Sequence, residues 1–95
     1  MAIFEGSFKA KAIRDFYYSG VTRRLPIKNT AKLQDILDYI DTIDQLPPTP
    51  LLYRAHEHKG AGAGTWSFDL TGNMRLLCEF DEDGDPINIR IEDPH

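Results

Sequence analysis

Histidine and arginine side chains that could carry acid–base or phosphate chemistry lie in the second half of this sequence. Imidazoles occur at His56, His58 and His95. Because a histidine titrates near pH ~6.5, it can take up or release a proton at cellular pH. Arg75 stands between Met74 and Leu76, where a charge needs a partner or an open surface. An arginine fork can bind phosphate through two N–H groups, so these residues could transfer protons and hold an anion.

The last of these imidazoles ends the sequence, in Asp93-Pro94-His95. Apolar and polar residues alternate in the run before this triplet: Ile87, Ile89 and Ile91 are apolar, and Asn88, Arg90 and Glu92 are polar. Such alternation is typical of a strand and not of a frayed terminal tail. We therefore expect His95 to be held in place. Strand parity would put Asp93 and His95 on the side of the isoleucines, although Pro94 interrupts the alternation.

Non-catalytic interpretations exist for the same residues. His56 could be an ordinary residue on the surface of a sheet, His58 an incidental neighbour, and Lys59 a turn lysine before Gly60. A metal site is also conceivable, but in an extended strand two residues at positions i and i+2 lie ~7 Å apart, which is wide for sharing one ion. Since no cysteine pair suggests zinc, we expect no metal and no cofactor.

Length and composition indicate one small domain over residues 1–95, with 41% hydrophobic and 11% aromatic residues. Apolar runs are far shorter than the ~20 residues of a membrane span, and the N-terminus lacks a signal-like core. We expect a cytoplasmic protein without a membrane partner. The single cysteine, Cys78, lies in phase with Met74, Leu76 and Phe80 and is predicted to be a core thiol.

The net charge of −4 is unevenly distributed along the sequence. Residues 1–32 hold seven Lys/Arg against two acids, residues 33–48 hold four Asp and no base, and residues 81–95 hold six acids against one base. The basic N-terminal part could face a polyanion, whereas the acidic remainder would oppose non-specific binding. On charge alone, a solvated mixed surface is the simpler interpretation.

Two helices are predicted in the first half of the chain. The first spans Lys9 to Ser19, with Gly20 as its stop and a buried stripe of Ile13, Phe16 and Tyr17. The second is capped by Asn29 or Thr30 and ends before Pro47-Pro48. Its apolar face is formed by Leu33, Ile36, Leu37, Ile40 and Ile43, and Asp35, Asp38 and Asp41 stay largely outside.

After the prolines the apolar period falls towards two, which indicates a sheet. The predicted strands are Leu52 to His56, Thr65 to Leu70, Asn73 to Phe80 and Ile87 to Asp93. Glycine-, aspartate- and asparagine-rich connections separate them, so the strands should form an antiparallel meander. We predict an α+β two-layer sandwich, with the helices on one face of the sheet and the other face open for a ligand.

Five segments resemble HigB-type toxins of the RelE superfamily, the ribosome-dependent messenger-RNA nucleases of bacterial type II toxin–antitoxin systems. They are Leu52-Tyr53-Arg54-Ala55-His56, Lys59-Gly60, Gly64-Thr65-Trp66-Ser67, Asn73-Met74-Arg75 and Asp93-Pro94-His95. The similarity runs over nearly the whole chain and is most specific from Lys59 to Arg75 and at the ending. It implies a RelE-like sandwich with a mainly antiparallel sheet of four to five strands.

The resemblance also implies an activity and partners. The expected reaction is metal-independent cleavage of messenger RNA in the ribosomal A site on the 30S subunit, inhibited by a cognate HigA-like antitoxin. His56, Asp93 and His95 would transfer protons, while Lys59, Arg75 and Asn73 would hold the RNA and its phosphate. Which imidazole is the base stays open at this point. Trp66 and Phe68 are predicted to be core residues.

Two departures from the family pattern keep alternatives open. The family commonly ends in Asp-Tyr-His, with an aromatic ring able to stack on a base, where this chain has Pro94. The pI of about 5.2 is also low for a ribosome-binding toxin. A non-enzymatic module on the same fold, either gyrase-targeting or a toxin that only binds its antitoxin, is therefore the alternative. A housekeeping RNA-binding domain without cleavage is a third possibility.

Overall fold

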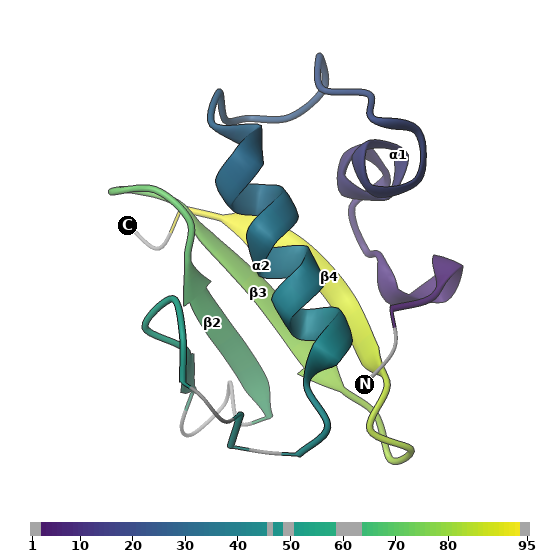
Figure 1. Cartoon of the computed structure of the whole chain (residues 1–95), viewed down its shortest axis with the longest axis vertical. Helices are drawn as coiled ribbons and strands as arrows, with labels where there is room; N and C mark the ends of the chain where they lie inside the picture. The colour runs from purple at the N-terminus through teal and green to yellow at the C-terminus, as the bar shows by residue number, and fades with distance from the viewer. Residues whose placement is uncertain (1–2, 46, 49–50, 59–63, 94–95) are drawn as a thin grey trace.

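Two helices and a four-stranded sheet make up this fold, as the computed structural model shows for residues 3–45, 47–48, 51–58 and 64–93. The elements are η1 (Glu5–Ser7), α1 (Lys11–Ser19), α2 (Thr30–Thr42), β1 (His56–Glu57), β2 (Thr65–Asp69), β3 (Arg75–Phe80) and β4 (Pro86–Glu92). In Figure 1, α2 lies across one face of the sheet and α1 lies on the β4 side. The predicted α+β arrangement, with both helices preceding an antiparallel sheet, is confirmed.

The end of α1 and the beginning of α2 lie where the local sequence predicts. Gly20 closes α1 at φ 72°, a left-handed conformation that glycine adopts without a Cβ penalty, and its N–H donates to the carbonyl of Phe16. Asn29 caps α2, because its side-chain oxygen accepts from the N–H of Lys32 at 3.4 Å. The first helix starts two residues later than predicted, because the backbone of Ala10 is extended (φ −96°, ψ 116°), and the N–H groups of Lys9 and Ala10 donate to the carbonyl of Ile89.

The sheet is an antiparallel meander in the order β1-β2-β3-β4, as the short connections predicted. The first predicted strand is wrong over most of its length, because only His56 and Glu57 pair with β2. Tyr53 and Arg54 before them have φ of 57° and 51°. A left-handed backbone breaks an extended strand, so the chain turns here before it joins the sheet edge.

A fifth strand is represented by a single contact. Phe8 forms an isolated parallel bridge with Ile89 on the outer side of β4. Ser7 is fully buried beside it, and its hydroxyl accepts from the N–H of Phe4 at 2.9 Å. The N-terminal segment thus covers the edge of β4 and ties α1 to the sheet.

The core lies between α2 and the sheet, and each helix contributes its predicted apolar stripe. Phe68 is fully buried and Trp66 nearly so, which confirms both as core residues. The buried cluster comprises Ile13, Phe16, Leu33, Ile36, Leu37, Ile40, Ile43, Ala55, Trp66, Phe68, Leu70, Leu76, Cys78 and Ile89. Burial of each large apolar side chain contributes roughly 1.5–3 kcal/mol, so this layer fixes the sheet on one face and leaves the opposite face to polar residues.

The buried thiol of Cys78 makes stability depend on alkaline pH. Burial raises the pKa of this thiol to about 12, above the ordinary value of 9.0. Between these values the unfolded chain loses a proton that the folded chain keeps, so stability is intact below pH 9 and falls as pH rises. By pH 10 the expected loss in the free energy of unfolding is about 1.4 kcal/mol.

Urea unfolding at pH 8 and pH 10, compared between the wild type and Cys78→Ala, measures this term. The variant should show a smaller decrease between the two pH values, by about 1.4 kcal/mol, whatever its absolute stability. Equal decreases in the two proteins would contradict a buried, protonated Cys78.

Candidate functional site

The face of the sheet turned away from α2, here called the open face, carries two rows of polar residues. Antiparallel partners point to the same side of a sheet, so the register gives each row directly. One row contains His56, Ser67, Leu77 and Arg90, and the next contains Asp69, Arg75 and Glu92. Residues more than 30 positions apart in sequence (His56 and Arg90) therefore share one surface.

A hollow of about 520 Å³ lies on the open face. It is lined by His56, His58, Ser67, Arg75, Leu77 and Glu92. Ser67 and Leu77 are only 3% and 5% exposed and form its floor, while the longer charged and imidazole side chains form its walls. A concave surface on which a few polar groups converge is a usual feature of a ligand site.

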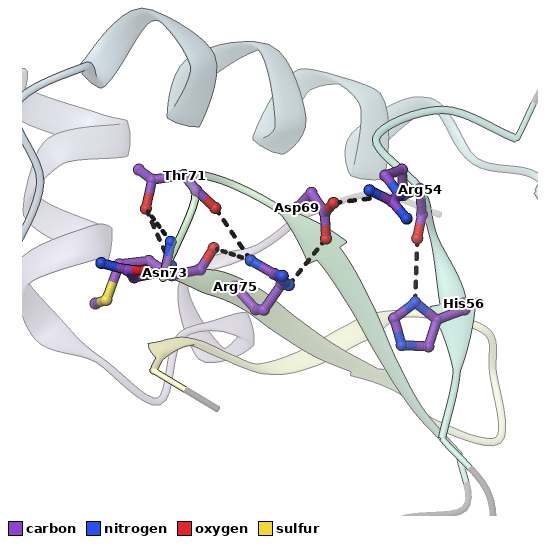
Figure 2. Close-up of polar contacts among 7 residues, drawn as sticks. Arg54, His56, Asp69, Thr71, Asn73 and Arg75 are labelled. Atoms are coloured by element: carbon purple, nitrogen blue, oxygen red, sulfur yellow. Dashed lines mark hydrogen bonds and ion pairs between the residues drawn. The ribbon is translucent and has the colours of Figure 1, made fainter. Parts of the chain in front are cut away.

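Arg75 is the most constrained charged group in this hollow. It stands at the first position of β3 and its side chain is 27% exposed. Its Nε lies 2.9 Å from Oδ1 of Asp69, and its Nη1 donates to the carbonyl oxygens of Thr71 (3.0 Å) and Met74 (3.1 Å). Figure 2 shows the guanidinium held between Asp69 and the β2–β3 turn. A charge next to an apolar strand is thus accommodated by partners on one side and an open cavity on the other.

His56 is exposed on β1, and its ring is oriented by the turn before it. Its Nδ1 lies 3.1 Å from the carbonyl oxygen of Arg54, an atom that can only accept. This contact assigns the hydrogen of the neutral ring to Nδ1 and leaves the lone pair on Nε2. The imidazole of His58 stacks on that of His56, with ring centroids 5.6 Å apart.

Arg54 connects the two halves of the site. Its backbone orients His56, while its side chain, 87% exposed, places Nε 3.5 Å from Oδ2 of Asp69. The left-handed conformation of Tyr53 and Arg54 is unusual for non-glycine residues. It is supported by the N–H of Asp69, which donates to the carbonyl of Tyr53 at 2.8 Å. The turn is therefore held in a shape that serves His56 and Asp69 together (Figure 2).

A second charged cluster borders the hollow on the β4 side. Arg90 pairs with Glu79 at 3.2 Å and with Glu92 at 3.3 Å. A β-bulge at Asn88, where φ is 54°, shifts the register between β3 and β4. This shift turns Ile87 to the side of Glu79 and keeps Ile89 in the core, so the isoleucines do not share one face as strict alternation predicted.

The structure brings together some of the sequence-predicted site residues and separates others. His56 and Arg75 line the same hollow. Asn73 lies in the β2–β3 turn, on the side of Arg75 away from His56 (Figure 2), and is not among the lining residues. Asp93 is exposed directly after β4, while its neighbour Glu92 faces Arg75 across the strand pair. Lys59 and His95 lie outside the described residues, as does Pro94.

Several residues of the site were not predicted from the sequence. Asp69 forms an ion pair with Arg75, and the carbonyl of Arg54 contacts the ring of His56. The hollow is also lined by Ser67, Leu77 and Glu92. Alternation along the predicted strand from Thr65 to Leu70 offered a signal, because it sets Ser67 and Asp69 opposite the apolar Trp66 and Phe68. Their pairing with His56 and Arg75 depends on register, which alternation does not specify.

A second hollow, of about 450 Å³, lies beside α1 and is lined by Glu5, Arg14, Asp15, Tyr18 and Ser19. Arg14 and Arg24 both pair with Asp15, at 3.4 Å and 3.6 Å, so the basic groups there are already partly neutralised. It lacks the pairing of an imidazole with an arginine that the open face offers.

Among the described residues, the acidic side chains close enough to share a metal ion are Asp81, Asp83 and Asp85 in the β3–β4 loop. Oδ1 of Asp81 accepts from the N–H groups of Asp83 and Asp85, both at 2.9 Å, which is the hydrogen bonding of an aspartate-initiated turn. The cluster is therefore explained by loop geometry.

In the part of the chain that the structure describes, no helix is long and apolar enough to cross a membrane.

Comparison with known proteins finds a similarity over almost the whole chain. No protein-family model matches the chain. It is 31% identical over 90 residues to endoribonuclease HigB of Proteus vulgaris, and the alignment covers 94% of this chain and 97% of that protein. The similarity therefore spans almost the full length of both proteins.

Proposed function

Because this chain belongs to the HigB family of RelE-superfamily toxins, we propose that it is an endoribonuclease toxin that cleaves messenger RNA on the ribosome. The observation that carries the proposal is the hollow of the open face, where an imidazole with an available Nε2 and a restrained arginine line one cavity. The similarity to a named endoribonuclease over almost the full length of both chains supports it.

Cleavage of RNA through its 2′-hydroxyl fits these groups. Nε2 of His56 takes the proton of the 2′-hydroxyl, whose oxygen attacks the adjacent phosphorus. The phosphorane carries extra negative charge, which the Arg75 guanidinium stabilises. The bond from phosphorus to the 5′-oxygen then breaks, leaving a 2′,3′-cyclic phosphate and a 5′-hydroxyl once the leaving oxygen receives a proton.

The remaining proposed roles belong to residues near the chain end and in the β1–β2 connection. We assign protonation of the leaving oxygen to His95, assisted by Asp93, and a second contact to the phosphate to Lys59. Asn73 is proposed to bind RNA outside the hollow, since it lies in the turn beyond Arg75. A HigA-like antitoxin and the 30S subunit in the cytoplasm are the proposed partners, carried from the family.

Expression with and without the neighbouring antitoxin gene, followed by mapping of RNA 5′ ends, tests the proposed function. The unprotected cell should stop growing, and its messages should acquire new 5′ ends within translated regions. Purified protein should produce the same ends on ribosome-bound messages and fewer on free RNA. Normal growth with intact messages would overturn the proposal.

An alternative function is favoured by specific observations. Pro94 removes the aromatic residue with which family members commonly end, and the described ion pairs of the open face balance Arg54, Arg75 and Arg90 against Asp69, Glu79 and Glu92. A balanced surface attracts RNA weakly. A binding module without nuclease activity, directed at gyrase or at the antitoxin alone, would fit both features. A gyrase supercoiling assay run beside the RNA-end mapping separates the two.

A further inference from the structure

Among the described residues, the polar contacts of Arg75 leave one end of its guanidinium for a ligand. The group has five N–H hydrogens, of which one is on Nε and two are on each Nη. Nε forms an ion pair with Oδ1 of Asp69 at 2.9 Å, and Nη1 donates hydrogen bonds to the carbonyls of Thr71 and Met74. Within the described part of the chain, the two hydrogens on Nη2 are those that these contacts leave for a phosphate oxygen.

The carboxylate of Asp69 is divided between two arginines. Oδ1 contacts Nε of Arg75, while Oδ2 contacts Nε of Arg54 at 3.5 Å. A carboxylate facing an arginine side-on usually takes both Nε and Nη2. Here the second oxygen contacts Arg54 (Figure 2), and Nη2 of Arg75 donates no hydrogen bond to a described residue.

We propose that Asp69 is a positioning residue, which holds the Arg75 guanidinium so that Nη2 meets the scissile phosphate. The inference rests on the proposed function, because a scissile phosphate exists only if the chain cleaves RNA. Asp69 is suited to this role, since it lies on the rigid β2 strand, is 21% exposed and does not line the hollow itself. Arg54 supports it from the other side and also orients His56, which links the two proposed reacting groups.

A competing role for Asp69 would be electrostatic only, and it predicts different kinetics. A carboxylate beside a phosphate site repels RNA, so removing its charge would strengthen binding and leave the chemical step unchanged. A positioning role predicts the reverse, because a misplaced arginine still attracts RNA but stabilises the transition state poorly.

Two substitutions at Asp69 separate these roles. Asp69→Ala removes both acceptor oxygens, whereas Asp69→Asn removes the charge but keeps one oxygen that can accept from Nε of Arg75. Positioning predicts that kcat on ribosome-bound message falls about 10- to 100-fold in Asp69→Ala, with KM changed less than about threefold, and that Asp69→Asn recovers part of the loss. Equal kcat in the wild type and both variants would overturn the proposal.

Control variants test whether the effect acts through Arg75. Asp44→Ala removes the same charge from an exposed position just beyond α2 and should leave kcat unchanged. In an Arg75→Lys background the Nε contact is absent, so Asp69→Ala should lower kcat by less than about threefold further. The full loss in that background would show that Asp69 acts independently of Arg75 and would overturn the proposal.

A spectroscopic readout keeps this inference separate from the proposed function. In ¹⁵N-resolved NMR spectra, the Nε–H of Arg75 should give a sharp, slowly exchanging signal in the wild type that is lost in Asp69→Ala. Retention of that signal would contradict the restraint by Asp69. If the wild type cleaves no RNA, the proposed function fails and with it the catalytic consequence, while the NMR signal still decides whether Asp69 orients Arg75.

Discussion

Replacing Arg75 by alanine should reduce RNA cleavage by at least about 100-fold and abolish growth arrest. The guanidinium is the charged donor that the structure places in the hollow beside His56, and loss of one such donor to a developing anion costs roughly 10²–10³ in rate. Single-turnover cleavage of a ribosome-bound message measures the effect directly, and colony counts after induction report it in cells.

Two variants make the Arg75 result interpretable. Arg23→Ala removes an equal charge from the exposed connection between α1 and α2, so it controls for weaker overall attraction to RNA. Arg75→Lys keeps the charge but cannot reproduce the contacts of Nε and Nη1, and it should remain strongly impaired. Thermal unfolding of all three proteins verifies the fold. Full toxicity in a folded Arg75→Ala protein would move the active site away from the open face.

Replacing His56 by alanine should lower the cleavage rate by about 100- to 10,000-fold, the range typical for loss of a general base. The physical reason is the contact of Nδ1 with the carbonyl of Arg54, which leaves Nε2 as the proton acceptor in the neutral ring. Because His56 is exposed on a short edge strand, the substitution should leave the free energy of unfolding almost unchanged.

His58 provides a matched control for this experiment. It lines the same hollow and stacks on His56, yet the proposed reaction assigns it no proton transfer. His58→Ala should therefore reduce the rate only a few-fold, by loosening the neighbouring ring. A larger loss in His58→Ala than in His56→Ala would exchange the roles of the two imidazoles.

Local sequence patterns predicted most of the fold because each depends on neighbours in the chain. The 3.6-residue period of Leu33, Ile36, Leu37 and Ile40 gave the buried face of α2, and all four are fully buried. The glycine after Ser19 gave the end of α1. Local patterns failed at Tyr53 and Arg54, where apolar and polar residues in alternation suggested a strand but the backbone turns through left-handed conformations.

The candidate site was only partly predictable. His56 and Arg75 were identified from residue type and family resemblance, and they line one hollow. Glu92, not Asp93, faces Arg75, as alternation with Ile89 and Ile91 indicated, whereas the bulge at Asn88 puts Ile87 on the opposite side from these two isoleucines. A single extra residue in a ladder reverses the parity of everything beyond it, and no local signal around Asn88 announced this bulge.

The amino-acid sequence alone was sufficient for the two-layer architecture and the meander. These follow from periodicity and turn residues, which are properties of short segments, whereas the candidate site residues were proposed from side-chain type and the family resemblance. The partners of Arg75 and the tautomer of His56 could be identified only in the folded chain. Strand register brings Asp69 to Arg75, the β2–β3 turn brings the Thr71 carbonyl to the same side chain, and the turn at Tyr53 and Arg54 brings the Arg54 carbonyl to His56. The orientation of a reacting group depends on contacts between segments that are distant in sequence, and those contacts form only when the strands pair in their final register.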